Sequence, residues 1–367
     1  MRILFLNWRD TSHPKAGGAE QLTENIAAEL ARRDHQVTLL CPSFPGCRPE
    51  ENKRGYRVIR HGHQITVRFH AWRLWQKEFR RHRNSICVDQ IHGLPFFTPF
   101  YSHRHTLAFI HEVAGQCWEY NFPFPLSTIG KIAEKTWLQL YRRTPFITVS
   151  QSTKQELIDA GIPEHAISII PESVDIAPLP SPIFHKSDPI VTSLGRIAPI
   201  KNIGDTIKAC LLLRKTFPNI KLWIIGSGHG RYYQDIIKMA EQHPDFITVW
   251  GYVNDTKKIE LLSRSKILTS TSHKEGYGLN IIEAAACGVP SVAYNVGGLR
   301  EAIINNQTGL LTDQNTPVDL ARKLEKLLTN DDLYQTLARK AWQRSHDFSS
   351  QKTADAFEKN IRQLNLS

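Results

Sequence analysis

The sequence predicts an α/β protein built from two doubly wound domains. Apolar strands such as RILFLN (2–7) and IVTSLGRI (190–197) alternate with segments of helical periodicity along the chain. These strands are apolar on both faces, which is typical of a parallel sheet covered by helices on both sides. With 367 residues, the chain is too long for one hydrophobic core and of suitable length for two domains.

The first domain is predicted to span residues 1–175. After the strand at 2–7 comes a helix in which Leu22, Ile26 and Leu30 repeat at helical spacing. Further strands of this domain are expected at VTLLC (37–41), RVIR (57–60), SICVDQ (85–90), TLAFIH (106–111) and FITVS (146–150). The segment APLPSPIFHKSDP (177–189) interrupts every periodic pattern with prolines and polar residues, and we interpret it as the linker.

The second domain is predicted to span residues 176–348, where the alternation of strands and helices restarts. Its strands are expected at 190–197, KLWIIGSG (221–228), ITVWGYV (247–253), KILTSTS (266–272) and SVAYNVGG (291–298). A last helix at 349–367 places Ala354, Phe357, Ile361 and Leu364 on one face behind a serine cap.

Composition and charge narrow the class of protein. No apolar run approaches the roughly 20 residues of a membrane span, and the N-terminus does not look like a signal peptide, so we expect a cytoplasmic protein. The 6 cysteines form no CxxC pair, which argues against a zinc site or a disulfide framework. The net charge of +11, concentrated in the first 170 residues, suggests an acidic partner: a phospholipid surface, a phosphorylated acceptor or a nucleic acid.

The stretch HKEGYGLNIIEAAACGVP (273–290) carries the most informative pattern. Its glycines lie between a strand and a helix that ends at Gly288, so the N–H groups of Leu279 to Ile281 point beyond the strand end, where they favour an anion. Glu275 would lie near the reacting end of a phosphate ligand, and Glu283 could accept hydrogen bonds from a diol such as a ribose. The alternative is a turn whose glycines serve packing alone, with Glu283 solvated in the first turn.

Two cations follow the first strand of the second domain. In SLGRIAPIKN, Arg196 lies just past the strand and Lys201 lies in the loop before the next helix. Open α/β sheets bind ligands beyond the carboxyl ends of their strands, and two such domains facing each other would form a cleft. We therefore expect Arg196 and Lys201 to clamp a diphosphate, the alternative being two solvated surface charges.

Weaker signals lie on other loops. Gly226 and Gly228 in GSGHG could admit a nucleotide close to the backbone, although the spacing is not the GxGxxG of dinucleotide-binding proteins. Tyr252 and Val253 are candidates to meet a base, with core packing an equal alternative for the valine.

In the first domain, Gly17 and Gly18 would let the backbone approach a phosphate. His111 ends a strand and is the best placed of 16 histidines to meet a substrate, with a structural role an equal alternative.

A basic and aromatic segment, VRFHAWRLWQKEFRRHR, occupies residues 67–83. As a helix it would align Phe69, Trp72, Trp75 (or Gln76) and Phe79 in one apolar stripe flanked by cations. Such a stripe suits docking at an anionic lipid interface. A helix that covers its own sheet and exposes a solvated basic face is an equal alternative.

Taken together, these motifs resemble the retaining nucleotide-sugar glycosyltransferases of the GT-B fold, specifically glycosyltransferase family 4. The resemblance covers nearly the whole chain and rests on GGAEQL, QIHGLPFFTPFY, FIHE, FITVSQSTKQELIDAGIPEHAISIIPESVD, GRIAPIKN and EGYGLNIIEAAACGVPSVAYNVGGLREAIINNQTGLL. The combination of E-x7-E with the following GxP and GG is highly specific. PESVD replaces the more usual PNGVD of the family, and GSGHG replaces G-x-G-P, which leaves the contacts to the base open.

The resemblance implies an acceptor-binding first domain, rejoined by the C-terminal helix, and a donor-binding second domain. It implies that Arg196 and Lys201 hold the donor phosphates, that Glu283 binds the ribose, and that His111 and Glu275 lie near the transferred sugar. These two cations, His111 and Glu275 are the predicted catalytic residues. The predicted donor-binding residues are Gly17, Gly18, Gly226, Gly228, Tyr252, Val253, Gly276, Tyr277, Gly278, Leu279, Asn280 and Glu283.

The predicted activity is transfer of a hexosyl group, with retention, from a UDP-sugar or GDP-mannose to a lipid-linked or saccharide acceptor. Positive charge at the clamp would stabilise the leaving diphosphate, so neither a metal nor another cofactor is expected. A front-face displacement fits better than a covalent glycosyl-enzyme intermediate, because no carboxylate is evident on the opposite face. The alternatives are a basic nucleic-acid-binding protein, although no recognised motif for it is present, and an inactive paralogue that binds sugar nucleotides.

Overall fold

The computed structural model describes residues 1–364 and divides them into two compact units. Unit 1 comprises residues 1–173 and the segment from Ser349, and unit 2 comprises Val174–Phe348. The predicted boundary at 175/176 lies two residues further along the chain. Residues 365–367 of the predicted last helix lie outside the described residues.

Unit 1 contains an eight-stranded sheet of order β3-β4-β2-β1-β5-β6-β7-β8, in which only the β3/β4 pair is antiparallel. Its strands are β1 Arg2–Leu6, β2 Gln36–Cys41, β3 Glu50–Lys53, β4 Tyr56–Arg60, β5 Ser85–Gln90, β6 Thr106–Phe109, β7 Phe146–Thr148 and β8 Ile167–Ile169. Its α-helices are α1 Gly18–Arg32, α2 Val67–Leu74, α3 Cys117–Asn121, α4 Leu126–Leu140, α5 Gln151–Asp159 and α13 Ser350–Leu364. Edge strands β3 and β8 were not predicted, since EENK carries no apolar pattern and β8 has three residues.

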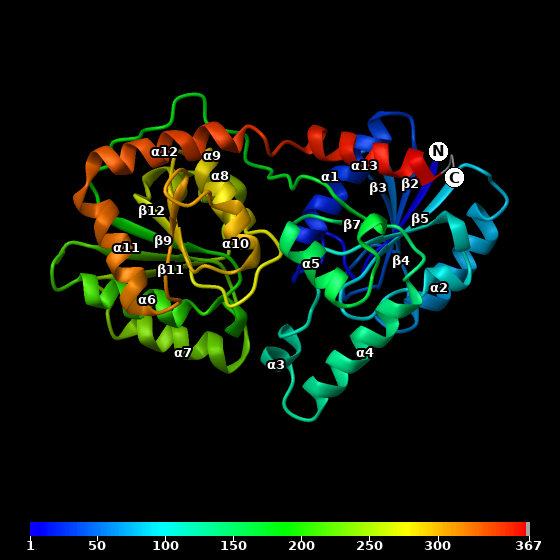
Figure 1. The fold of residues 1–367 in the computed structure, drawn as a ribbon, viewed down its shortest axis with the longest axis horizontal. Helices are drawn as coiled ribbons and strands as arrows, with labels where there is room; N and C mark the ends of the chain where they lie inside the picture. The colour runs from blue at the N-terminus through cyan, green and yellow to red at the C-terminus, as the bar shows by residue number, and fades with distance from the viewer. Residues whose placement is uncertain (365–367) are drawn as a thin grey trace. The chain divides into compact units, whose positions relative to one another are not determined.

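Alternation along β1 distributes its side chains to two layers. Leu4 and Leu6 pack in one core cluster with Val67 and Ala71 of α2. Phe5, between them, stacks on Phe357 of α13 with ring centroids 5.5 Å apart. The last helix of the chain thus completes the core of unit 1, and Figure 1 shows it beside α1.

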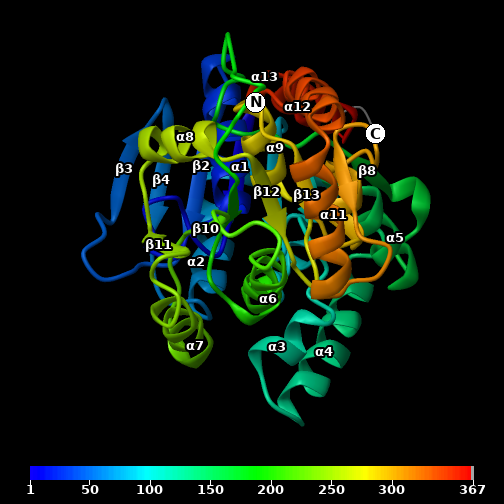
Figure 2. The same cartoon turned by 90° about the vertical axis from the view of Figure 1, so that its left-hand side faces the viewer.

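Unit 2 contains a six-stranded, entirely parallel sheet of order β11-β10-β9-β12-β13-β14. Its strands are β9 Ile190–Leu194, β10 Lys221–Ile225, β11 Ile247–Gly251, β12 Ile267–Ser270, β13 Ser291–Ala293 and β14 Gly309–Leu311. Its helices are α6 Ile203–Leu213, α7 Gly230–Glu241, α8 Asp255–Arg264, α9 Leu279–Ala286, α10 Gly297–Ala302, α11 Pro317–Thr329 and α12 Asp331–Ser345. Figure 2 shows α6 and α11 near the sheet strands that they cover. The predicted doubly wound architecture is confirmed in both units.

The predicted linker at 177–189 is wrong, because this segment packs within unit 2. The Leu179 N–H donates to the Ala286 carbonyl at 2.9 Å, and the Trp342 Nε1–H donates to the Leu179 carbonyl at 2.9 Å. Lys186 is buried and donates to the Ser265 carbonyl at 2.8 Å. Prolines exclude regular structure here, but the apolar and polar side chains between them still anchor the segment.

The apolar stripe predicted for 67–83 is also wrong. Trp75 and Phe79 are buried in the unit 1 core, whereas Phe69 and Trp72 are 55% and 43% exposed. The buried positions follow steps of four residues from Val67, continued by a π-helical turn at Trp75–Phe79, so the two aromatic pairs face different environments. The helix therefore covers its own sheet, as the alternative expected.

Candidate functional site

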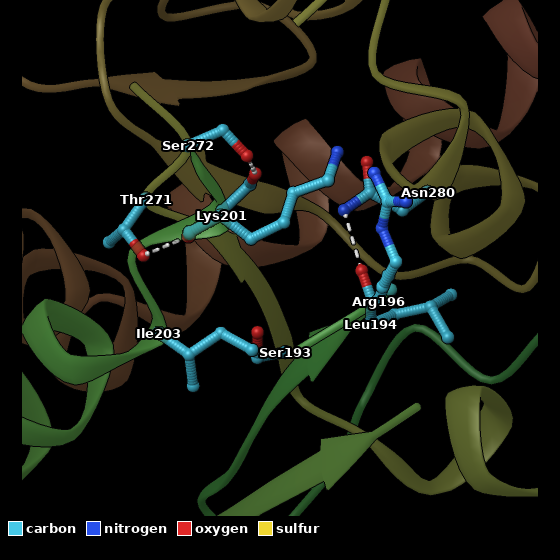
Figure 3. Close-up of a pocket in the computed structure, with 10 residues that line it drawn as sticks. Ser193, Leu194, Arg196, Lys201, Ile203, Thr271, Ser272 and Asn280 are labelled. Atoms are coloured by element: carbon cyan, nitrogen blue, oxygen red, sulfur yellow. Dashed lines mark hydrogen bonds between the residues drawn. The ribbon is translucent and has the colours of Figure 1, made fainter. Parts of the chain in front are cut away.

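A pocket of about 220 Å³, counted out to its open mouth, lies at the carboxyl ends of β9 and β12 in unit 2. It is lined by Ser193, Leu194, Gly195, Arg196, Lys201, Ile203, Ser270, Thr271, Ser272 and Asn280. Figure 3 shows the Lys201 side chain extending toward Arg196 and Asn280. Three of the predicted site residues thus meet at the strand ends where ligands of open α/β sheets bind.

Hydrogen bonds fix the loop that carries Lys201 to the loop after β12. The Thr271 hydroxyl donates to the Asn202 carbonyl at 2.8 Å, and the His273 N–H donates to the Ile200 carbonyl at 2.9 Å. Asn202 itself adopts a left-handed conformation (φ 48°) at the start of α6. The backbone on both sides of Lys201 is therefore held by the loop that follows β12.

Charge in the pocket is unevenly compensated. Lys201 forms an ion pair with Glu275, whose Oε1 also accepts a hydrogen bond from the Ser272 hydroxyl at 3.2 Å. Arg196 is exposed and makes no ion pair within residues 1–364. With two cations and one paired carboxylate, the pocket retains positive charge that an anionic ligand can neutralise.

The start of α9 forms one wall. Gly278 precedes the helix with φ 97°, and the Asn280 side chain donates to the Leu194 carbonyl at 3.0 Å, which ties the helix start to the end of β9. The Ile281 N–H is already bonded to Asn280 Oδ1 at 3.0 Å and to the Gly278 carbonyl at 3.0 Å. The prediction that this N–H points into open space is therefore wrong, because the Asn280 side chain caps it.

The EGYG loop packs against Gly298, a residue that was not among the predicted site residues. The Gly298 N–H donates to the Glu275 carbonyl at 3.2 Å, and a Cβ on Gly298 would lie 2.5 Å from the Gly276 carbonyl carbon and from the Tyr277 nitrogen. The ring of Tyr277 packs on Phe348, with centroids 5.7 Å apart, so its side chain belongs to the core. The only sequence signal for Gly298 was the GG pair quoted in the resemblance.

Glu283 lies outside the pocket lining and is paired with Lys258 of α8 at 2.6 Å. Burial raises the pKa of Glu283 above its usual range, an effect that the nearby Lys258 partly offsets. Burial alone would lower the pKa of Lys258, but the Glu283 carboxylate raises it. The alternative interpretation of Glu283 as a solvated residue of the first turn is wrong, since it follows that turn and is largely buried.

Gly226 and Gly228 of GSGHG affect the pocket indirectly, because they pack against the loop that carries Arg196. A Cβ on Gly226 would lie 2.0 Å from the Gly195 carbonyl oxygen, and one on Gly228 would lie 2.3 Å from the Ile197 carbonyl oxygen. Neither lines the pocket; both let the loop after β10 pack on the loop that carries Arg196. We infer that their role is to position that arginine.

The two candidate base-binding residues differ in their environment. Tyr252 is 84% exposed after β11 and is free to meet a ligand. Val253 packs against the core cluster that includes Trp223, so the core-packing alternative holds for it.

In unit 1, His111 follows β6 and is buried against aromatic rings. It stacks on Phe109 and on His92, with centroids 4.4 and 5.6 Å apart, and its Nδ1 lies 3.9 Å from Glu172 Oε1. Its Nε2 is buried without a hydrogen-bond partner within residues 1–364. Burial lowers the pKa of His92 well below its usual range, and the neighbouring His111 lowers it further. Sequence reasoning did not select His92 or Glu172, although both lie in motifs quoted for the resemblance.

Gly17 and Gly18 are exposed at the start of α1, and the Gly17 N–H donates to Glu20 Oε2 at 2.7 Å. Within residues 1–364, no three His, Cys, Asp or Glu side chains are grouped as metal ligands, and no helix has the length and apolar character of a membrane span.

Family models match both units. A model described as "Glycosyltransferase Family 4" matches residues 16–177, and one described as "Glycosyl transferases group 1" matches residues 180–344. The chain belongs to glycosyltransferase family 4. The predicted enzyme class is thereby confirmed.

Curated relatives of this glycosyltransferase extend over almost its full length. Glycogen synthase from Mycobacterium tuberculosis is 29% identical over 97% of this chain and 93% of its own. D-inositol 3-phosphate glycosyltransferase from Paenarthrobacter aurescens is 25% identical over 92% of this chain and 91% of its own.

Solved structures show the GT-B fold. Sucrose-phosphate synthase from Thermosynechococcus elongatus superposes with a TM-score of 0.80 and 18% identity, covering 99% of this chain and 98% of that one. HepE from Anabaena, solved in complex with UDP-glucose, superposes with a TM-score of 0.75 and 18% identity, covering 99% of this chain and 100% of that one.

Proposed function

We propose that this glycosyltransferase holds the diphosphate of a nucleotide-sugar between Arg196 and Lys201 and transfers the hexosyl group with retention. The observation that carries the proposal is the meeting of these two cations in one pocket beside the start of α9. Arg196 supplies forked donors and Lys201 a point charge, and the N–H groups of Leu279 and Asn280, which precede the capped Ile281, would complement them. All three favour a ligand with several negative charges.

The donor that we propose to test first is a UDP-sugar, with GDP-mannose second. Support comes from the HepE structure, which holds UDP-glucose in a chain of the same fold. Tyr252, exposed on the loop after β11, is available to stack on the base. Glu283 would bind the ribose by exchanging part of its hydrogen bonding with Lys258 for the sugar diol.

In the proposed step, the bond from the anomeric carbon to the diphosphate oxygen breaks while the acceptor oxygen bonds to the same face of that carbon. The acceptor proton passes to the departing phosphate oxygen. Negative charge grows on the diphosphate during this step, and Arg196 and Lys201 are already positioned to stabilise it. The proposal requires no metal, because these cations supply the positive charge.

For the acceptor we propose a lipid-linked or saccharide hydroxyl. His111 is proposed to meet the transferred sugar through its Nε2, a buried polar atom that has no hydrogen-bond partner within residues 1–364. A sugar hydroxyl would satisfy this nitrogen, which otherwise carries the cost of burial without a bond.

The test is a thermal-shift series with UDP, GDP, ADP and NAD, each with and without EDTA, followed by NMR of the product anomer. A nucleotide at about a hundred times its dissociation constant should stabilise the chain by roughly 2.7 kcal/mol. We expect UDP or GDP to give this shift with EDTA present, and the product to keep the donor's anomeric configuration. A shift with NAD alone, or an inverted product, would refute the proposal.

The same series separates the alternatives. Nucleotide binding without transfer to any acceptor or water would favour an inactive paralogue. Binding of duplex or single-stranded nucleic acid with a steep salt dependence would favour the nucleic-acid interpretation. No structural observation favours either one over transfer.

A further inference from the structure

Helix α4 presents its apolar side to solvent. Leu126, Ile129 and Ile132 recur along one side of the helix and are 55%, 57% and 63% exposed. Phe122 and Phe124, just before the helix, are also exposed, Phe124 to 83%. We call these five residues the α4 face.

The opposite side of α4 explains this orientation, because it is the side that packs. Gly130 lies so close to the Trp118 indole that a Cβ there would be 2.3 Å from the ring. The buried Glu134 carboxylate accepts hydrogen bonds from the Ala114 and Gly115 N–H groups at 2.8 Å each and from Trp118 Nε1–H at 3.1 Å. The packed side, which also contains the buried Leu138, thus holds α4 to α3, to the loop before it and to the core of unit 1, and it leaves Leu126, Ile129 and Ile132 uncovered.

The exposed charge in the second half of α4 and just after it is positive. Lys135, Arg142 and Arg143 are exposed and have no ion-pair partner within residues 1–364. The one exposed carboxylate between residues 116 and 143 belongs to Glu119, which is tied to Lys131. An apolar face that is followed along the same helix by unpaired cations complements a surface that is apolar inside and anionic outside.

The location suits contact with an extended surface. Figures 1 and 2 both place α3 and the start of α4 at the end of unit 1 opposite to α13. By contrast, the exposed apolar residues at α2 are three, Ile65, Phe69 and Trp72, and the series ends there because Trp75 and Phe79 are buried.

We propose that the α4 face docks the enzyme to an anionic lipid membrane, with its aromatic and aliphatic side chains in the interfacial layer and Lys135, Arg142 and Arg143 at the headgroups. A second copy of this chain is a poorer occupant, because it would bring like charges together at the rim. The proposal is independent of the donor and of the transfer mechanism.

The test is co-sedimentation of the full chain with vesicles of phosphatidylcholine alone and with about 30% phosphatidylglycerol. The test variant is Phe124→Ser/Ile129→Gln/Ile132→Gln, and the matched control is Phe69→Ser/Trp72→Ser on α2. All five positions are exposed, and circular dichroism with the UDP thermal shift checks the fold. We expect native protein to bind the anionic vesicles, the triple variant to bind at least about tenfold more weakly, and the control to bind like the native chain.

Three results would overturn the proposal: no binding of the native chain, equal binding by the triple variant, or loss of binding in the control instead. Gel filtration provides a fourth, since a dimer abolished by the triple variant with vesicle binding unchanged would assign the face to a second copy. If the triple variant does not fold, Ile132→Glu alone is measured in its place, with the same expectation.

Discussion

Lys201 and Glu275 form an ion pair that joins the loop after β9 to the loop after β12. Because Ser272 donates to the same carboxylate oxygen, Glu275 has a fixed position from which it holds the ammonium group at the pocket. A bound diphosphate would compete with Glu275 for that ammonium. Under the proposed function, the pair would keep Lys201 ordered before the donor arrives.

Replacing Lys201 should remove activity and leave the fold intact. For Lys201→Met we expect kcat/KM to fall by at least about 100-fold, since half of the charge facing the leaving group is lost. The free energy of unfolding should fall by about 2 kcal/mol, because the Glu275 carboxylate, which is 12% exposed, loses its cation but keeps its bond to Ser272. Steady-state transfer assays and urea melts measure both. The control is Lys208→Met, an exposed lysine of α6, and full activity of Lys201→Met would contradict the assignment.

Substitutions of Arg196 test whether its guanidinium group binds two phosphate oxygens at once. Arg196→Ala should weaken UDP binding by about tenfold or more, and Arg196→Lys should recover only part of that loss, because lysine cannot bind two phosphate oxygens in parallel. Isothermal titration calorimetry measures the dissociation constants, with Lys340→Ala on the exposed side of α12 as control. If Arg196→Ala binds UDP with unchanged affinity, Arg196 is a solvated surface charge and not a phosphate ligand.

Gly298 should tolerate no side chain. In Gly298→Ala the new Cβ would lie 2.5 Å from backbone atoms of Gly276 and Tyr277, so the EGYG loop must move. We expect a loss of about 2 kcal/mol in unfolding free energy and weaker UDP binding. Gly204→Ala is the matched control in α6, where the nearest atom would lie 4.0 Å away and helix propensity should add stability. Equal stability of the two variants would show that the loop does not depend on Gly298.

Lys258 should matter for stability as well as for Glu283. Lys258→Met leaves the largely buried Glu283 carboxylate without its cation, and we expect a cost of about 3 kcal/mol. Adding Glu283→Gln should recover much of that cost, because no buried charge then remains unpaired. A double-mutant cycle by urea denaturation measures the coupling, and additive effects would mean that the pair contributes nothing.

Acid should weaken the attachment of α13 to unit 1. Burial opposes ionisation of Glu358, but hydrogen bonds from Arg33, Arg362 and His35 outweigh it and lower the pKa of Glu358 to about 2. Its folded pKa lies below the ordinary 4.5, so the stabilisation is complete above about pH 4.5 and is lost as the pH falls toward about 2. We expect Glu358→Gln to cost about 2 kcal/mol at pH 7 and little at pH 2.5 in urea melts. The same cost at both pH values would exclude this linkage.

The part of the pocket that is formed by residues next to a strand in the sequence was predictable. Arg196 and Lys201 follow an apolar strand directly, so the rule that ligands bind beyond parallel strand ends places both correctly. Gly298 was not predictable, because its contact with the EGYG loop exists only through the pairing of β12 with β13. The pairing of Glu283 with Lys258 likewise joins two helices whose packing leaves no local pattern.

Helix orientation was the harder problem. Two apolar series in residues 67–83 end in Trp75 and Phe79: one begins with Phe69 and Trp72, the other with Val67 and Ala71. The sequence does not show which of the two packs against the sheet, and the structure buries the second. For α4 a hydrophobicity pattern would direct Leu126, Ile129 and Ile132 inward, yet the helix packs through Gly130 and Glu134. In α4, the close approach at Gly130 and the buried hydrogen bonds of Glu134 determine the contact face, and neither is visible in an apolar period. In the 67–83 helix, the buried side is one of two possible apolar series, the one that repeats in steps of four residues from Val67.

The placement of α13 in unit 1 has a consequence for biosynthesis. During translation, every residue of unit 2 leaves the ribosome before Phe357 can stack on Phe5. Unit 2 can therefore reach its native state first. Until α13 is synthesised, part of the core of unit 1 stays exposed to solvent, although most of unit 1 is synthesised earlier. In this chain the N-terminal half is synthesised first and finished last, and nascent molecules would need protection at that open surface until the final helix emerges.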